Sequence, residues 1–265
     1  MRGYFGVQTF QENLMRLRLV LALAATLVCG ALAAADLTIT FNSVAKGMMG
    51  AGGTSTEIHY YSSEFNMVRN EKDRRDTLVD FKNGISYTID HKKKTISKMS
   101  FDDALAALES LNAAQPEGMG QMFGAMFGDP NDFKVDKVGP ETVAGRSCTA
   151  WNIRVGKLAM SLSADPTLKQ PIPDTTYMKM VQARAAQFAK AGPMGASFKR
   201  LYEEMAKIKG IPLKTHMTGM MGMDVATEAT KIEQGPVPAA TFTLPAGYKI
   251  EDAGKKMREE MMKKK

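Results

Sequence analysis

Hydrophobic and polar residues alternate one by one along the first part of the chain, from Leu37 to Met99. Within it, Ile85, Tyr87 and Ile89 alternate with polar neighbours, which is the pattern of a half-buried strand. Turn-forming stretches such as "KNG" and "DHKKK" separate the runs, so we predict an antiparallel meander of strands. Its other predicted strands are Leu37–Phe41, Glu57–Tyr61, Phe65–Arg69 and Leu78–Lys82.

The hydrophobic period changes at Ser100, where apolar residues begin to recur at three and four positions. Ser100 followed by Asp103 has the outline of a capping box, and the pattern predicts a helix over Phe101–Ala114. The segment after it is rich in glycine, and we expect a flexible apolar loop there. Its contact residues would be Met119, Met122, Phe123, Met126 and Phe127.

Strands and helices alternate again in the second half. Trp151, Ile153 and Val155 alternate with polar residues up to Gly156-Lys157, a two-residue hairpin connection, and Leu158, Met160 and Leu162 return on the other side. Two helices should follow, with apolar stripes about one face wide, and they should lie on a sheet. Their stripes are Met178, Val181, Ala185 and Phe188, then Phe198, Leu201, Tyr202, Met205 and Ile208. Closing strands are predicted at Pro212–Thr218, Asp224–Glu233 and Thr241–Leu244.

The N-terminal residues 1–35 read as a secretory signal peptide. Met15–Arg18 is a basic start, Leu19–Ala33 is an apolar run of about 15 residues against the roughly 20 that span a bilayer, and small residues precede Asp36. The true start could be Met15. Lipidation of Cys29 is disfavoured because Thr26-Leu27-Val28 precedes it. We therefore expect a protein outside the cytoplasm, periplasmic or otherwise exported, and soluble after cleavage.

After the signal, the chain is expected to form a single domain over residues 36–250, followed by a basic tail over residues 251–265, helical or frayed. Without the signal and the last eleven residues, the body carries 26 basic and 25 acidic residues, so it is neutral. The tail "KKMREEMMKKK" is the basic part, and two readings stay open: contact with an anionic membrane surface, or a solvated helix end. The neutral body argues against nucleic acid as a partner.

Signatures of enzyme chemistry are missing from the sequence. We find no nucleophile elbow, no histidines at helical spacing and no thiolate pair, so no catalytic residue is assigned, no cofactor is expected and the protein is predicted not to be an enzyme. The glycine-rich stretch Gly47–Thr56 lacks the lysine of a phosphate-binding loop. Cys148, the only cysteine after the signal, is expected to be a small buried hydrophobe without redox function.

One methionine-rich stretch, "HMTGMMGMDV", has two interpretations. His216, Met217, Met220, Met221 and Met223 could hold Cu(I), because thioethers select that ion. Methionine also fills irregular apolar space, and this chain uses it in every region. We favour apolar packing or contact with a hydrophobic ligand, and keep Cu(I) binding as an alternative.

Several stretches together resemble an uncharacterised bacterial exported family, the domain of unknown function 4412 type. They are "RDTLVDFKNGISYTIDHKKKT", "VAGRSCTAWNI", "KGIPLKT" and "FTLPAGYK". That family is in turn similar to the periplasmic lipoprotein-carrier (LolA-like) half-barrel superfamily. The resemblance implies an α+β fold: a strongly curved antiparallel sheet, an unclosed β-barrel, with about three helices covering its concave face.

The resemblance also implies an apolar cavity between sheet and helices. Its candidate ligand-binding residues are Ile85, Tyr87, Ile89, Trp151, Ile153, Met178, Val181, Phe188, Leu201 and Met205. The function we expect is that of an exported, non-enzymatic binding or carrier protein that holds an acyl or lipid-like group. The alternatives are a structural or envelope-stress interaction protein with a packed interior, and a Cu(I)-binding protein. Nothing in the sequence favours a particular oligomeric state.

Overall fold

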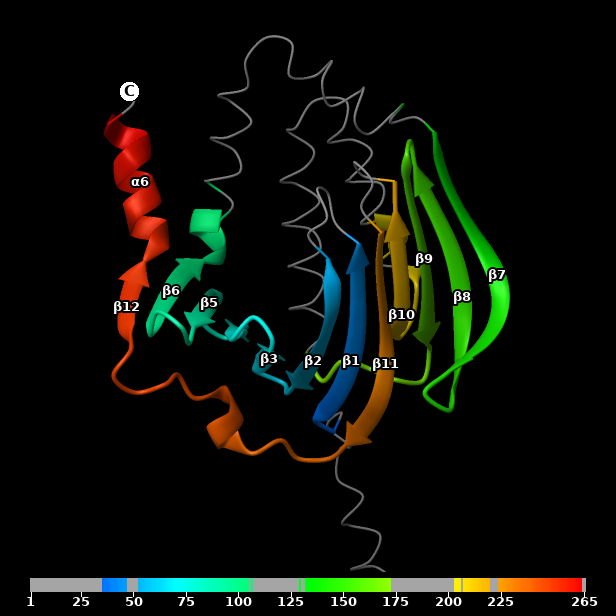
Figure 1. Ribbon diagram of the computed structural model, residues 1–265, viewed down its shortest axis with the longest axis horizontal. Coiled ribbons are helices and arrows are strands. Elements are labelled where there is room, and N and C mark those ends of the chain that lie inside the picture. The colour runs from blue at the N-terminus through cyan, green and yellow to red at the C-terminus, as the bar shows by residue number, and fades with distance from the viewer. Residues whose placement is uncertain are drawn as a thin grey trace, which may run out of the picture. The chain divides into compact units, whose positions relative to one another are not determined.

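The computed structural model forms one sheet of twelve strands in the order β12-β6-β5-β4-β3-β2-β1-β11-β10-β9-β8-β7 (Figure 1). It describes residues 35–46, 52–104, 106, 129, 132–172, 203–205, 207–219 and 224–263. Every neighbouring pair of strands is antiparallel except β12 and β6, which are parallel. The strands are β1 Leu37–Lys46, β2 Gly53–Tyr61, β3 Phe65–Asn70, β4 Arg75–Asp80, β5 Ile85–Asp90, β6 Thr95–Ser100, β7 Phe133–Val143, β8 Arg146–Val155, β9 Leu158–Asp165, β10 Ile211–Thr218, β11 Asp224–Gln234 and β12 Lys249–Asp252; η2 spans Ala239–Phe242 and α6 spans Ala253–Lys263.

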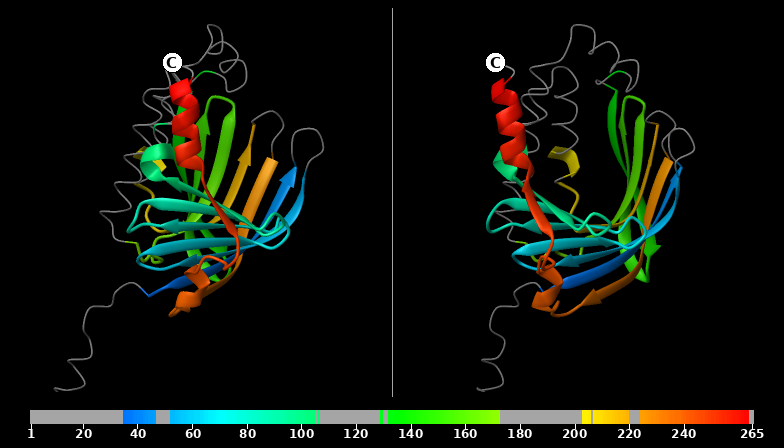
Figure 2. Two further views of the ribbon diagram at one scale, coloured as in Figure 1. Left: turned by 90° about the vertical axis from the view of Figure 1, so that its left-hand side faces the viewer. Right: turned by 60° about the vertical axis from the view of Figure 1, so that its left-hand side comes forward.

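The sheet is curved and unclosed, as predicted (Figure 2). Its two outer strands are β12 and β7, which do not pair with each other. Three of the strand pairings contain a register shift. The shifts lie between Thr40 and Phe41, between Pro212 and Lys214, and between Lys137 and Gly139. Since an extra residue bends its strand and increases the local twist, these positions help the sheet to curve.

Strands β3 to β6 form a regular meander with a period of ten residues. Each strand has six residues, and a four-residue turn connects it to the next. The last residue of each turn has a left-handed backbone: Arg74 at φ 52°, Gly84 at φ 62° and Lys94 at φ 52°. Its carbonyl oxygen accepts a backbone N–H from the neighbouring segment, as from His91 to Arg74 at 3.0 Å. The meander predicted from the alternation is confirmed, although β4 begins at Arg75 and ends at Asp80, ahead of the predicted Leu78–Lys82.

A buried core lies on one face of the central strands. It consists of Leu37, Ile39, Phe41, Tyr61, Val143, Cys148, Leu168, Ile211, Leu213 and Ala229. Leu168 belongs to the connection after β9 and is fully buried, so this connection closes one end of the core. Burying large aliphatic side chains such as Leu37 and Ile39 contributes about 1.5–3 kcal/mol each.

A second core lies on the opposite face, over β3 to β6. The chain between β11 and β12 crosses this face, and its residues Phe242, Leu244 and Tyr248 pack on Met67, Leu78, Ile89 and Ile96. Phe65 and Phe242 stack with ring centroids 5.4 Å apart. We call residues 235–248 the crossover segment. Apolar residues on both faces of the sheet are therefore covered.

The crossover segment corrects one prediction. Thr241–Leu244 was expected to be a strand, but Ala239–Phe242 is a short 3-10 helix and no strand includes Leu244. These apolar residues pack against the second core without pairing in the sheet. A local sequence pattern does not distinguish such a segment from a strand. The closing strand of the sheet is β12, Lys249–Asp252, which has no apolar alternation.

The start of the predicted helix after Ser100 is confirmed. The Asp103 backbone N–H donates to Ser100 Oγ at 3.0 Å, and the Ser100 hydroxyl donates to the Asp103 carboxylate at 2.7 Å. Residues 101–104 are helical. Most of the two later predicted helices lies outside the described residues, where only 203–205 and 207 are helical. The signal segment and the loop residues Met119, Met122, Phe123, Met126 and Phe127 also lie outside the described residues.

Candidate functional site

The inner side of the curved sheet carries an apolar surface on β7 to β10. Direct cross-strand pairing places Val135, Ile153, Met160 and Met217 in one row across four strands. Trp151 lies two residues from Ile153 on the same face of β8 and pairs with Leu162 of β9. We call Val135, Trp151, Ile153, Met160 and Met217 the concave strip.

Burial within the concave strip is uneven. Ile153 is buried, whereas Val135, Trp151, Met160 and Met217 are only half-buried. Met205 and Ile208 pack against this cluster from inside the curve of the sheet, where Figure 2 shows their segment in yellow. The strip is therefore an apolar surface whose large side chains keep part of their area accessible.

The structure separates the predicted cavity residues into two groups. Trp151, Ile153 and Met205 meet in the cluster of the concave strip. Tyr87 and Ile89 instead belong to the second core, beneath the crossover segment, and Ile85 lies on their face of β5. Strand β5 thus directs its apolar alternates away from the concave strip. Four further candidates lie outside the described residues: Met178, Val181, Phe188 and Leu201.

A polar cluster occupies the inner face of β2. His59 Nδ1 lies 3.2 Å from the Tyr61 hydroxyl and His59 Nε2 lies 3.1 Å from the Glu57 carboxylate, which also accepts a hydrogen bond from Asn70 at 3.1 Å. The hydrogen bond from His59 lowers the pKa of Glu57, and burial raises the pKa of Tyr61 to about 12. The Phe41 ring contacts the imidazole edge-on, with centroids 4.8 Å apart. Both imidazole nitrogens are thus engaged within the cluster.

A second cluster of the same kind lies beside the second core. His91 Nε2 is 3.0 Å from the Asp76 carboxylate, and His91 Nδ1 is 3.0 Å from the Tyr248 hydroxyl. It links the β5–β6 turn to the crossover segment, 157 residues later in the chain. Sequence reasoning missed both clusters. In "EIHYY" the spacing of two residues between Glu57, His59 and Tyr61 was a usable signal, since such residues share one face of a strand.

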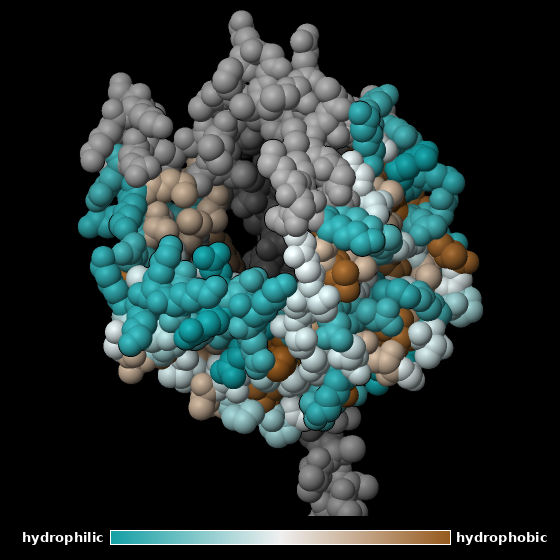
Figure 3. Space-filling view, viewed as in Figure 1, coloured by the Kyte–Doolittle hydropathy of each residue, from teal (hydrophilic) through white to brown (hydrophobic). Residues whose placement is uncertain are grey.

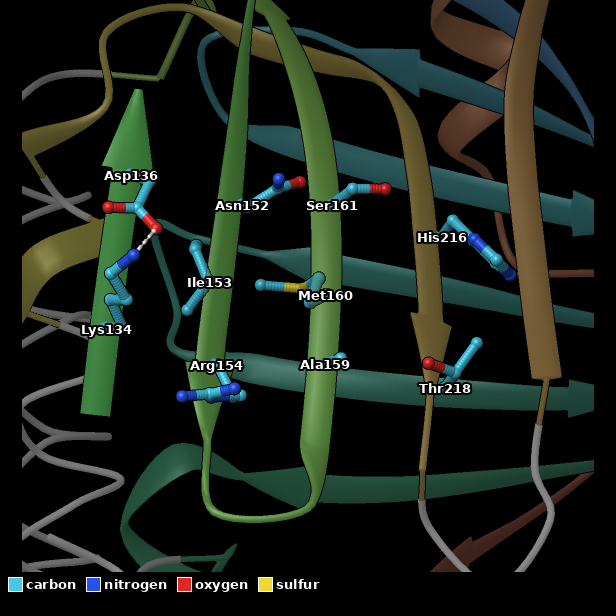
Figure 4. A pocket seen from close by; sticks show the side chains of 10 residues that line it. All are labelled: Lys134, Asp136, Asn152, Ile153, Arg154, Ala159, Met160, Ser161, His216 and Thr218. Carbon is cyan, nitrogen blue, oxygen red and sulfur yellow. Dashed lines mark ion pairs between the residues drawn. The ribbon is translucent and has the colours of Figure 1, made fainter. Parts of the chain in front are cut away.

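The outer face of β7 to β10 is hollowed into a pocket of about 420 Å³ (Figure 4). Its charged side chains are all engaged within the protein. Lys134 pairs with Asp136 at 2.8 Å, Arg154 with Asp132 at 3.1 Å, and His216 with Asp224 at 2.8 Å. The small side chains of Ala159 and Ser161 on β9 form the hollow between the longer residues of β8 and β10. This pocket presents no unbalanced charge to a ligand.

His216 and Met217, the first two residues of the proposed Cu(I) group, are neighbours on β10 and therefore point to opposite faces. His216 lies on the outer face beside Asp224, and Met217 lies in the concave strip opposite Met160. Met220, Met221 and Met223 lie outside the described residues. Within the part of the chain that the structure describes, no three histidine, cysteine or carboxylate side chains gather as metal ligands would.

Cys148 is a free thiol buried in the first core. Its Sγ lies 3.7 Å from the Arg146 carbonyl oxygen. Burial, followed by the negative charge of Asp165, raises the pKa of the thiol, which disfavours the reactive thiolate. The thiol therefore serves as a small apolar core residue.

The family model described as a domain of unknown function (DUF4412) matches residues 67–248. The chain belongs to this family. The match begins in β3 and ends at Tyr248, so it covers the concave strip and all of the second core except Tyr60 and Phe65. No curated protein sequence matches the chain. Among the described residues, none of the helices combines the length and the apolarity that a bilayer-spanning helix requires.

The solved structures that match this chain have low sequence identity to it. PNGF-II, solved in the C2 space group, is 12% identical with a TM-score of 0.40, and the match covers 87% of this chain but 33% of PNGF-II. The Pseudomonas aeruginosa MucA/MucB complex matches at 13% identity and a TM-score of 0.40, over 82% of this chain and 58% of the other. The LolA superfamily protein NE2245 of Nitrosomonas europaea matches at 8% identity and a TM-score of 0.32, over 79% and 90% of the two chains. This chain thus spans about a third of PNGF-II.

Proposed function

We propose that this protein is an exported, non-enzymatic binding protein that holds a hydrophobic group, such as an acyl chain, against the concave strip. The observation that carries the proposal is the partial burial of Val135, Trp151, Met160 and Met217 in one apolar surface. A surface of large apolar side chains on the inner side of a curved sheet suits a ligand that has to leave water.

The chemistry of the strip favours a flexible apolar ligand. Two of its side chains are methionines, which are unbranched and adapt to ligands of varied shape. Each methylene removed from water contributes about 0.8 kcal/mol, so affinity should rise by up to about fourfold for each added methylene that the strip covers.

Separate features of the chain support export and a non-enzymatic function. The segment from Met15 to Ala35 has the composition of a signal peptide, which supports export. His59 and His91, which lie in the two clusters, each use both ring nitrogens for bonds within the protein. These bonds link β2 to itself and the β5–β6 turn to the crossover segment, a structural role that fits a binding protein.

Native mass spectrometry of the chain from Asp36 to Lys265, exported by a bacterial host and purified without detergent, tests the proposal. We expect an adduct of lipid mass that organic extraction removes. An adduct of copper mass would favour the Cu(I) alternative. A mass that stays bare after incubation with lipid extract and with Cu(I) would contradict the proposal and favour a packed, structural protein.

Adjacent residues on β9 provide a matched pair of variants. Met160→Glu places a charge in the concave strip, and Ala159→Glu places the same charge on the exposed outer face of the strand. The first should lose the adduct and the second should keep it. Thermal unfolding of both variants distinguishes loss of binding from loss of the fold. Equal retention of lipid by two folded variants would exclude the concave strip as the site.

A further inference from the structure

A second pocket, of about 440 Å³, lies on the opposite face of the sheet from the concave strip. The β3–β4 turn, the start of the β5–β6 turn and the crossover segment enclose it. Met67 and Ile89, both almost fully buried, contribute apolar atoms to its lining, and Arg69, Arg74 and His91 contribute polar ones. The pocket therefore combines apolar and cationic groups.

The charge around this pocket differs from that of the pocket in Figure 4. Among the residues that the structure describes, the exposed Arg74 has no ion-pair partner. The adjacent β5–β6 turn adds three consecutive exposed lysines, Lys92, Lys93 and Lys94, which likewise have no ion pair within the described residues. In Figure 3, hydrophilic residues gather over β3, β5 and β6. Although the β3–β4 turn also carries the exposed carboxylates Glu71 and Asp73, this end of the meander keeps a net positive charge.

Backbone conformation marks the same two turns. The three meander turns each end in a left-handed residue, which is glycine at position 84 but arginine at 74 and lysine at 94. Consecutive hairpin turns lie at alternate ends of a meander, so Arg74 and Lys94 share the end beside the pocket and Gly84 lies at the other. A left-handed conformation costs a residue with a side chain free energy that glycine avoids, and such strain is concentrated at functional sites. Among the described residues, one further non-glycine residue has a left-handed backbone, Ala144 in the β7–β8 hairpin.

The other polar groups of the pocket are held in place. Arg69 lies 3.9 Å from the Asp76 carboxylate and stacks over the Tyr60 ring, with its guanidinium carbon 5.4 Å from the ring centroid. His91 is fixed between Asp76 and Tyr248. The Asp76 charge is therefore shared by two partners. Glu71, exposed at the rim, is the remaining carboxylate of the lining.

We propose that this pocket binds a phosphate-bearing ligand, with Arg74 and the Lys92–Lys94 turn contacting the phosphate and the apolar atoms of Met67 and Ile89 contacting an adjoining apolar group. A guanidinium matches the geometry of phosphate oxygens, and several cations in and beside one pocket suit an anion better than a neutral group. The phosphate could belong to a soluble molecule or to a lipid headgroup. The site does not depend on the concave strip, so either can fail alone.

Isothermal titration calorimetry with inorganic phosphate tests the site. The left-handed turn residues offer a variant that removes charge without disturbing the backbone. Arg74→Gly removes the cation while keeping the backbone conformation that glycine prefers, so the fold should be retained. We expect it to weaken phosphate binding by at least about tenfold. Glu71→Gln, which removes the rim carboxylate, should strengthen binding. Lys169→Gln, at an exposed lysine after β9, is the control for loss of one charge elsewhere and should bind like the parent protein.

Co-sedimentation with vesicles identifies the source of the phosphate. Binding to vesicles that contain phosphatidylglycerol, competed by inorganic phosphate and absent with phosphatidylcholine alone, would assign a lipid headgroup; Arg74→Gly and Lys94→Gly should then each reduce partitioning by about fivefold. Binding of inorganic phosphate without vesicle binding would assign a soluble ligand. If neither probe binds, or if Arg74→Gly binds as tightly as Lys169→Gln, the proposed site is wrong.

Discussion

Strain in the meander turns predicts an unusual pair of opposite stability effects. A left-handed backbone costs a residue with a side chain about 1–2 kcal/mol. Replacing that residue by glycine removes this cost. It also raises the conformational entropy of the unfolded chain, which lowers the stability by about 0.4–1 kcal/mol. Arg74→Gly and Lys94→Gly should therefore each stabilise the protein by about 0.5–1 kcal/mol.

Gly84→Ala is the reverse experiment in the equivalent turn. A Cβ at this position would meet the Phe101 ring at 3.5 Å, an ordinary contact, so the backbone conformation alone should decide the result. We expect a destabilisation of about 0.5–1 kcal/mol.

Thermal and urea unfolding of the exported chain measure these changes. For a chain of this length, 1 kcal/mol corresponds to a shift of about 2–4 °C in Tm. The reasoning is refuted if both glycine variants are destabilised, or if Gly84→Ala is neutral, because the left-handed conformations would then carry no strain. Lys92→Gly, in the same turn but outside the left-handed position, is the control and should not be stabilised.

Three further predictions concern other parts of the sheet. Gly210→Ala should destabilise the protein by about 2–5 kcal/mol in urea unfolding, because φ is +95° and a Cβ would overlap the Asp165 carbonyl; a neutral result would contradict the described approach of the two segments. The pKa of Glu57 is lowered in the fold, so the ionised carboxylate stabilises the protein above its ordinary pKa of 4.5, and this stabilisation is lost as the pH falls below 4.5. The difference in unfolding free energy between the parent protein and Glu57→Gln should therefore shrink as the pH falls below 4.5. A difference that does not change with pH would contradict the His59 interaction. Cys148 should not react with a thiol reagent in the native protein and should react fully in denaturant, whereas stoichiometric native reaction would show that the thiol is accessible.

The local elements of this fold could be predicted well from residue patterns. The alternation of apolar and polar residues located most of the meander and the β8–β9 hairpin, because successive residues of a half-buried strand point in turn to the buried and the exposed face. Strand β12 escaped prediction, since it has four residues, pairs in parallel with β6 and shows no apolar alternation. The crossover segment was mistaken for a strand because its apolar residues meet partners more than 140 positions earlier in the chain, such as Phe65.

The site was harder to predict for a geometric reason. Alternation indicates which residues share a face of a strand but not what that face meets. Trp151 and Ile153 do lie on the inner side of the sheet, whereas Tyr87 and Ile89 follow the same pattern and pack beneath the crossover segment. Only the full topology distinguishes these faces. Predicting the cluster around His91 needs the same topology, because it joins side chains from distant parts of the sequence.

Quenching of tryptophan fluorescence by a brominated acyl chain tests the central claim most directly. Trp151 is the only tryptophan of the chain and lies in the concave strip, so its emission reports on this surface alone. Saturable quenching that unbrominated acyl chains compete away, and that Met160→Glu abolishes while Ala159→Glu retains it, is the predicted result. Quenching that never saturates, or that is equal in the two folded variants, would contradict binding of a hydrophobic group at the strip.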